Sequence, residues 1–187
     1  MIMKKLNIVF LDRATFGNDC KIKKPNFPHN WIEHQLTKKS QVFNRVKDAD
    51  IIITNKVILK NEYLKKLKKL KFIAIPSTGT NIIDLMYCKK LGIKVSNIRN
   101  YANDSVAEHV LGLIIYLTKK IGLVNDDIKK GKWQKRKTFG AFLRTIPILK
   151  GKKIGIIGKG STGKALAKIS RGFGMKVTFF SARKFKE

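Results

Sequence analysis

The 187-residue sequence predicts an α/β protein built on parallel sheets, and three observations support this fold class. Apolar, β-branched runs recur along residues 1–100 and alternate with segments of helical periodicity. The runs are continuous rather than alternating, as in strands that are buried on both faces of a parallel sheet. A second series of helix and strand patterns follows. We therefore expect two domains, residues 1–100 and 101–187.

The first domain is expected to contain five strands. Leu64 and Leu67 lie within a lysine-rich helical segment that begins at Lys60, and both leucines should point inward. The predicted strands cover residues 5–12, 31–36, 49–55, 71–77 and 94–98, and further helices cover 41–48 and 82–91.

The second domain should open with a long helix from Ser105, where Ser105 and Glu108 have the spacing of a capping box. An irregular segment, 131–147, leads to an apolar strand that starts at Ile154. A glycine turn, a helix to Gly174 and a strand over 176–180 complete the pattern.

The glycine turn is the most informative motif. Gly158, Gly160 and Gly163 stand between a strand and a helix, the arrangement that binds a nucleotide pyrophosphate on backbone amides. The same residues fit the spacing of an ATP-binding P-loop as far as Lys164, but Ala165 replaces the required hydroxyl. The motif therefore favours the first half of a Rossmann dinucleotide-binding domain. A glycine-rich turn that binds nothing is the alternative.

The end of the last strand bears on the choice of cofactor. In NAD-binding domains an acidic residue near this position binds the ribose hydroxyls. Ser181 stands there, and Arg183 and Lys184 could reach a 2′-phosphate. The cofactor is thus NAD or NADP, with NADP a specific hypothesis.

A second turn could bind a carboxylate. Residues 77–80 close a predicted strand, and Asn81 is a candidate N-cap for the helix that follows. The amides of Thr78, Gly79 and Thr80 would then face an anion at a helix N-terminus. An ordinary connecting loop explains this segment equally well.

The composition and charge of the sequence bear on whether the protein binds nucleic acids, metals or membranes. The net charge is +29, but only seven of the 41 basic residues are arginines and the lysines are spread along the chain. Nucleic-acid binding is therefore a minor alternative. Cys20 and Cys88 show no metal-ligand or redox-pair spacing, which suggests reduced thiols in a cytoplasmic protein. The longest apolar run, 110–117, is too short to span a membrane.

Together these segments resemble the D-isomer-specific 2-hydroxyacid dehydrogenase family, in particular its glycerate dehydrogenase (hydroxypyruvate reductase) branch. The similarity extends over most of the sequence. It is carried by residues 8–14, 27–31, 48–56, 77–84, 95–97, 101–102, 105–109, 131–133 and 149–177.

The resemblance implies a flavodoxin-like substrate domain followed by a partial Rossmann domain. Thr78 and Gly79 would contact the substrate carboxylate or the nicotinamide, and Ser105 would lie beside the cofactor. Most NAD-using members carry Asp at the position of Ser181. The pyrophosphate would be held by Gly158, Gly160, Ser161, Thr162 and Gly163.

The family's catalytic Arg, Glu and His have no counterpart in the 187 residues, so no catalytic residue is assigned. We expect an N-terminal fragment of a dehydrogenase, inactive alone, whose full-length form reduces a small 2-keto acid. The alternative is a subunit that acts as a homodimer or with a complementary C-terminal fragment.

Overall fold

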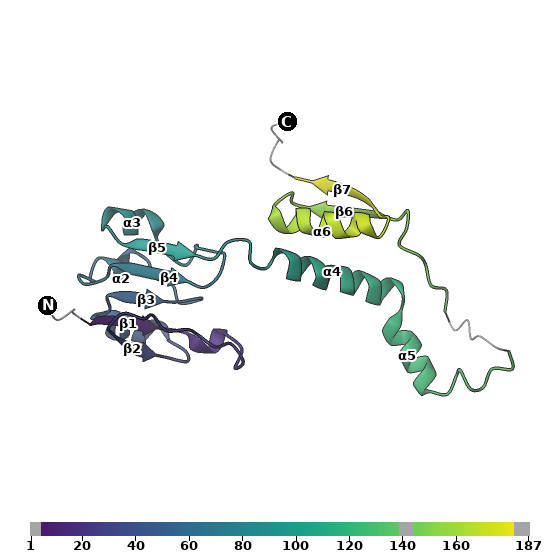
Figure 1. Cartoon of the computed structure of the whole chain (residues 1–187), viewed down its shortest axis with the longest axis horizontal. Coiled ribbons are helices and arrows are strands. Elements are labelled where there is room, and N and C mark those ends of the chain that lie inside the picture. Colours follow the sequence, from purple (N-terminus) through teal and green to yellow (C-terminus); the bar gives the residue numbers. More distant parts are fainter. Residues whose placement is uncertain (1–4, 139–143, 182–187) are drawn as a thin grey trace. The chain divides into compact units, whose positions relative to one another are not determined.

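A computed structural model describes residues 5–138 and 144–181, which belong to two compact units, Met1–Arg99 and Asn100–Glu187. Each unit is an α/β assembly (Figure 1).

Unit 1 contains a five-stranded sheet with the order β2-β1-β3-β4-β5 (Figure 1). All four strand pairs are parallel, which confirms the predicted fold class. Most strands are shorter than predicted because their ends turn into connecting loops, and β2 begins two residues earlier than predicted. Their bounds are β1 Leu6–Phe10, β2 His29–Glu33, β3 Ile51–Ile53, β4 Phe72–Ile75 and β5 Lys94–Asn97.

The core of unit 1 lies between this sheet and short helices. Ile52 and Ile73, from the central strands, are fully buried, as is Leu59. Leu64 and Leu67 are also buried, as predicted, but the helix that was expected to carry both ends at Leu64. The helices are η1 Arg13–Thr15, η2 Lys39–Gln41, α1 Val42–Val46, α2 Asn61–Leu64 and α3 Leu85–Lys90.

The start of α3 differs from the prediction. The helix begins at Leu85, and its N-cap is Asp84, whose side chain accepts a hydrogen bond from the Tyr87 amide at 3.0 Å. Asn81 is not the N-cap. The intervening residues cannot be helical because Ile83 forms a β-bridge with Leu59, and its amide closes a turn onto Thr80.

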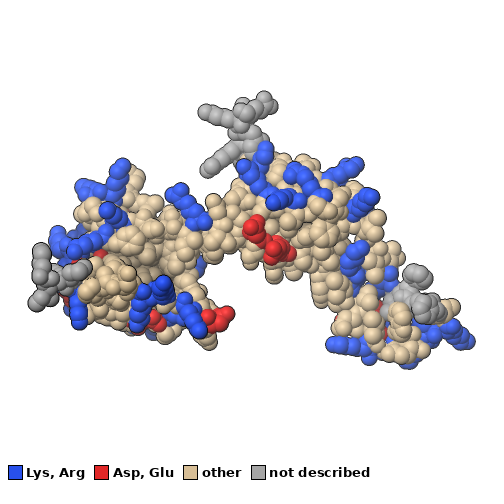
Figure 2. Space-filling model, in the orientation of Figure 1, with Lys and Arg blue, Asp and Glu red and all other residues tan. Residues whose placement is uncertain are grey.

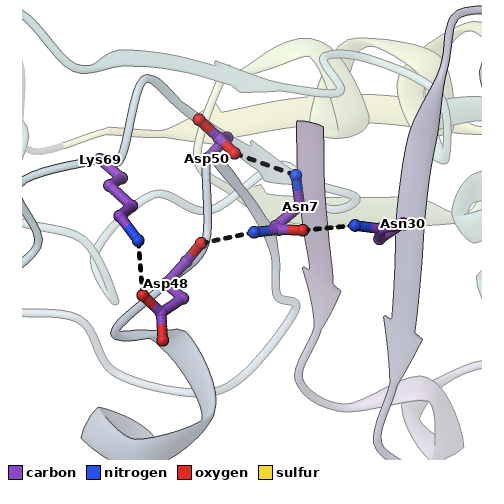
Figure 3. Close-up of polar contacts among 5 residues, drawn as sticks. All are labelled: Asn7, Asn30, Asp48, Asp50 and Lys69. Carbon is purple, nitrogen blue, oxygen red and sulfur yellow. Dashed lines mark hydrogen bonds and ion pairs between the residues drawn. The ribbon is translucent and has the colours of Figure 1, made fainter. Parts of the chain in front are cut away.

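A polar network joins four segments of unit 1 beside strands β1 and β2 (Figure 3). The Asn7 side chain donates to the Asp48 carbonyl at 3.1 Å and accepts from the Asn30 amide at 2.9 Å. The Asn7 backbone amide donates to the buried Asp50 carboxylate at 3.0 Å. Lys69 pairs with Asp48 at 2.7 Å and so lowers the pKa of the Asp48 carboxyl. These bonds tie the start of β1 to β2 and to the segment that enters β3.

Unit 2 contains two parallel strands and three helices (Figure 1). The long helix α4 packs on α6, which connects β6 to β7. The elements are α4 Asn103–Thr118, α5 Ile121–Lys129, β6 Lys153–Ile157, α6 Ser161–Gly172 and β7 Lys176–Phe180. No helix of the described residues is long and apolar enough to cross a membrane.

The predicted capping box of α4 is wrong. The helix begins two residues earlier, with Ala102 as N-cap and no capping side chain. The Val106 amide already donates to the Ala102 carbonyl at 2.9 Å. Ser105 therefore lies inside the first turn, where its hydroxyl cannot act as the cap.

The buried Asp127, near the end of α5, anchors the segment that follows the helix. Its carboxylate accepts from Lys132 at 2.6 Å and from Arg144 at 2.8 Å. These hydrogen bonds lower the pKa of the Asp127 carboxyl below its ordinary value.

Because the pKa of Asp127 is lower in the folded state, its contribution to stability is present above the unfolded pKa of about 3.9 and is lost as the pH falls below it. We expect the melting temperature of unit 2 to drop between about pH 5 and about pH 3. The Asp127→Asn variant should be less stable at neutral pH and should show a smaller drop. Thermal unfolding followed by circular dichroism measures both, and equal pH dependence in the two proteins would contradict this role.

Candidate functional site

The glycine turn of unit 2 has the geometry of a phosphate-binding loop. Gly158 has φ +99°, a conformation that favours glycine. A Cβ on Gly163 would lie 2.3 Å from the Gly158 carbonyl oxygen, so only glycine fits there. A Cβ on Gly160 would meet nothing within 4 Å. The turn is therefore tight on its inner side and open at Gly160, where a ligand can approach the backbone.

The N-terminus of α6 presents free donors next to this opening. The Lys164 amide makes the first bond of the helix, to the Gly160 carbonyl at 2.9 Å. The preceding amides of Ser161, Thr162 and Gly163 donate no hydrogen bond within the described residues, and no side chain caps the helix. Unpaired amides at the positive end of a 12-residue helix form an anion-binding site.

Two further predicted cofactor residues, Ser105 and Ser181, lie on or directly after elements that contact the turn and the start of α6. The Thr162 hydroxyl donates to the Asn103 side chain at 3.0 Å, so the first residue of α4, the helix that carries Ser105, contacts α6. The Gly158 amide donates to the Phe180 carbonyl at 2.8 Å, so Ser181 follows directly after the strand end that contacts the turn. Arg183 lies outside the described residues. The structure thus places Ser181 directly after the strand end that contacts the turn, and Ser105 two residues after the Asn103 side chain that contacts Thr162.

The second predicted site, in unit 1, is a loop without a helix N-terminus. Thr78 and Gly79 are exposed after β4, and their amides donate no hydrogen bond within the described part of the chain. The Asn97 side chain donates to the Thr78 carbonyl at 2.7 Å and orients the loop. Because α3 begins only at Leu85, the expected helix dipole does not reach these amides. The loop therefore offers its backbone amides without the support of a helix dipole.

The buried Asp12 follows β1, and the sequence assigned no role to it. Its carboxylate accepts from the backbone amides of Asn55, Lys56 and Val57 at 3.0, 2.6 and 3.2 Å. The Thr54 hydroxyl adds a fourth bond at 3.1 Å. An acid at the end of an apolar strand was the only signal in the sequence. Asp12 fixes the loop that follows β3.

The described residues contain no group of three or more His, Cys, Asp or Glu side chains that could hold a metal ion. On the face shown in Figure 2, lysine and arginine side chains are scattered over both units rather than gathered on one element. This distribution does not form the basic stripe that is typical of nucleic-acid-binding proteins.

Comparison with known proteins gives consistent matches. The model of the family "D-isomer specific 2-hydroxyacid dehydrogenase, catalytic domain" matches residues 14–184. Glycerate dehydrogenase of Methylorubrum extorquens is 40% identical over 174 residues, which cover 92% of this chain and 55% of that enzyme. Hydroxypyruvate reductase of Blautia hydrogenotrophica is 34% identical over 80% of this chain and 46% of its own length. The chain spans about half the length of these relatives.

Solved structures agree. D-lactate dehydrogenase from Aquifex aeolicus, complexed with NAD and lactic acid, aligns with a TM-score of 0.68 and 28% identity over 96% of this chain and 53% of that one. D-2-hydroxyisocaproate dehydrogenase aligns with a TM-score of 0.68 over 97% of this chain and 55% of that one, and its 22% identity supports the fold alone. The chain belongs to the D-isomer-specific 2-hydroxyacid dehydrogenase family.

Proposed function

We propose that this chain supplies the substrate-binding domain and the first half of the cofactor-binding domain of an NAD(P)H-dependent reductase of 2-keto acids. Residues 1–100 would bind the keto acid and residues 101–187 the cofactor. The observation that carries the proposal is the open glycine turn, with three unpaired amides at the start of α6. The identity to glycerate dehydrogenase favours hydroxypyruvate as the substrate.

The residues present fit a dinucleotide. Gly160 leaves room for a pyrophosphate, and the amides of Ser161, Thr162 and Gly163 would donate to it. Gly158 permits the turn that aims these amides outward. Ser105 would face the cofactor from the first turn of α4.

The keto acid would bind in unit 1. The unpaired amides of Thr78 and Gly79 are suited to the substrate carboxylate, and Asn97 holds the loop that carries them. A bound nicotinamide would supply the hydride for the keto carbon. The family resemblance assigns the proton donor to a His and the positioning of the keto acid to an Arg, and neither has a counterpart in this chain.

Binding and turnover should therefore separate. We expect the purified 187-residue chain to bind NADPH or NADH, as measured by the change in nicotinamide fluorescence. It should show no NADPH oxidation with hydroxypyruvate, because it lacks the proton donor. Turnover would refute the proposed inactivity. If the folded chain bound neither NADPH nor NADH, the proposed cofactor domain would be refuted.

Ser181 makes NADPH the proposed cofactor, because an acid at this position would repel a 2′-phosphate. We expect NADPH to bind more tightly than NADH. The Ser181→Asp variant should reverse the order, with about a tenfold gain for NADH relative to NADPH. Thr178→Asp is the matched control, since it adds the same charge at an exposed position within β7 and should leave the order unchanged. Tighter binding of NADH to the unmodified chain would contradict the preference.

A second candidate function is that of a subunit that completes its sheet with further strands. Ile157 and Phe180 are neighbours on β6 and β7 and are 88% and 67% exposed. Doubly wound nucleotide-binding sheets have about six strands, whereas the described part of unit 2 has two. We infer that this face packs against a C-terminal polypeptide of the same family or against a second copy of the chain. Light scattering distinguishes these assemblies, and a strictly monomeric chain that binds no such polypeptide would argue against both.

A further inference from the structure

Unit 1 contains a pocket of 590 Å³ that none of the proposed roles uses. It lies at the carboxyl ends of β1, β2 and β3. Its walls include Asp12 and Thr15 after β1, residues 36–39 after β2 and residues 56–58 after β3. Its volume is within the range of about 300–1,000 Å³ that small-molecule sites occupy.

The topology of the sheet favours this position for a ligand. In the order β2-β1-β3-β4-β5, the chain first passes from β1 to β2 on one side and then crosses to β3 on the other side of β1. The order therefore reverses between β1 and β3. In open parallel sheets, ligands bind outside the carboxyl ends of the strands at such a reversal.

Both walls of the pocket are held in place by hydrogen bonds. Asp12 binds the amides of residues 55–57 and so fixes the wall that follows β3. Arg45 donates to the Leu36 carbonyl at 2.6 Å and to the Thr37 hydroxyl at 2.7 Å. A site whose walls are already ordered loses little entropy when a ligand binds.

The charge of the lining is positive. Lys38, Lys39 and Lys56 line the pocket and form no ion pair within the described residues, whereas Lys60 donates to the Asn81 carbonyl. The Asp12 carboxylate already accepts four donors, so Glu62 is the one acid of the described lining that could offset the three lysines. Clustered lysines are suited to a phosphate group.

The remainder of the lining is apolar. Val42, Val57 and Ile58 line the pocket together with the ring of Tyr63. Val42 is buried, while Ile58 is 55% exposed and borders the opening to solvent. A bare phosphate would leave these side chains in water, whereas a ring attached to it would cover them.

We propose that this pocket binds a small phosphate ester with a ring-sized apolar body. The phosphate contacts Lys38, Lys39 and Lys56, and the ring packs on Val57, Ile58 and Tyr63. Thr78 and Gly79, which are proposed to bind the keto acid, do not line the pocket. The glycine turn belongs to the other unit. The inference therefore stands apart from the proposed function.

Calorimetry on the 187-residue chain tests the proposal with 1-naphthyl phosphate as the probe. Inorganic phosphate carries only the anionic group of this probe, and 1-naphthol carries only its ring. We expect 1-naphthyl phosphate to bind at least about tenfold more tightly than either, since both the charge and the ring contribute. Equal affinity for inorganic phosphate or for 1-naphthol would overturn the proposal.

Two pairs of adjacent lysines make matched variants. Lys38→Gln/Lys39→Gln removes two charges from the pocket, and Lys89→Gln/Lys90→Gln removes two exposed charges from α3. We expect about a fivefold or larger loss of affinity in the first and less than about a twofold change in the second. Equal losses of affinity in the two variants would show that the probe is attracted to the basic chain in general, and would overturn the proposed site. Gly160→Val, which blocks the proposed cofactor turn, should leave this affinity unchanged, so the two proposals can fail separately.

Discussion

Replacing Asp12 with alanine is expected to lower the free energy of unfolding of unit 1 by about 3 kcal/mol or more. The side chain is 2% exposed and accepts bonds from three backbone amides and one hydroxyl. Without the carboxylate, the amides of Asn55 and Lys56 lose their partner, whereas the Val57 amide keeps its hydrogen bond to the Thr54 hydroxyl at 3.0 Å. Each buried donor left unpaired costs about 1–3 kcal/mol unless water reaches it. The loop after β3 would then lose its fixed conformation.

Urea unfolding measures this loss. In a Trp133→Phe background, the fluorescence of Trp31 reports on unit 1 alone, because these are the two tryptophans of the chain. Asp19→Ala is the matched control, since Asp19 is exposed in the same unit and should change stability by less than about 0.5 kcal/mol. A loss below about 1 kcal/mol in Asp12→Ala would show that the four bonds do not hold the loop.

Gly160→Val is expected to weaken NADPH binding by at least about thirtyfold, the effect of losing about 2 kcal/mol. A valine side chain would extend into the open space where the pyrophosphate must approach the amides of α6. The backbone at Gly160 has φ −72° and ψ −176°, which any residue can adopt. The substitution should therefore block the ligand without unfolding the turn.

Gly155→Val provides the control for this variant. Gly155 is exposed on β6, and a Cβ there also meets nothing within 4 Å. Both variants add the same side chain to unit 2, but Gly155→Val adds it within the strand rather than at the turn. We expect its NADPH affinity to remain within about twofold of the unmodified chain. Equal losses in the two variants would place the cofactor elsewhere.

The fold class and the glycine turn could be predicted because their signals are local. Apolar runs such as residues 51–53 identify buried strands, and Gly158, Gly160 and Gly163 identify the turn from spacing alone. The observed limits of β7, Lys176–Phe180, coincide with the predicted ones.

The errors arose where tertiary contacts override local preference. Asn81 is a good N-cap by type, but the bridge between Leu59 and Ile83 delays the start of α3 to Leu85. Ser105 and Glu108 have the spacing of a capping box, yet α4 begins at Asn103, whose side chain accepts a hydrogen bond from Thr162 of α6. Leu59 and Thr162 are both distant in sequence from the helix starts that they contact, so neither contact can be recognised from the local sequence.

The pocket in unit 1 could not be predicted from the sequence for a related reason. Its walls come from three loops, about 20 residues apart in the sequence, and from α1 and α2, and they meet only because β1, β2 and β3 are adjacent. Asp12 is visible in the sequence as an acid after a strand, but its four donors belong to residues 54–57. Strand order is needed to bring them together.

Binding of a dinucleotide pyrophosphate at the start of α6 can be observed at the amide resonances of the chain. In a titration of the ¹⁵N-labelled protein with NADPH, we predict the largest shifts at the amides of Ser161, Thr162 and Gly163. Saturable binding with shifts at these three amides would support the account. Binding that leaves all three unchanged would contradict it.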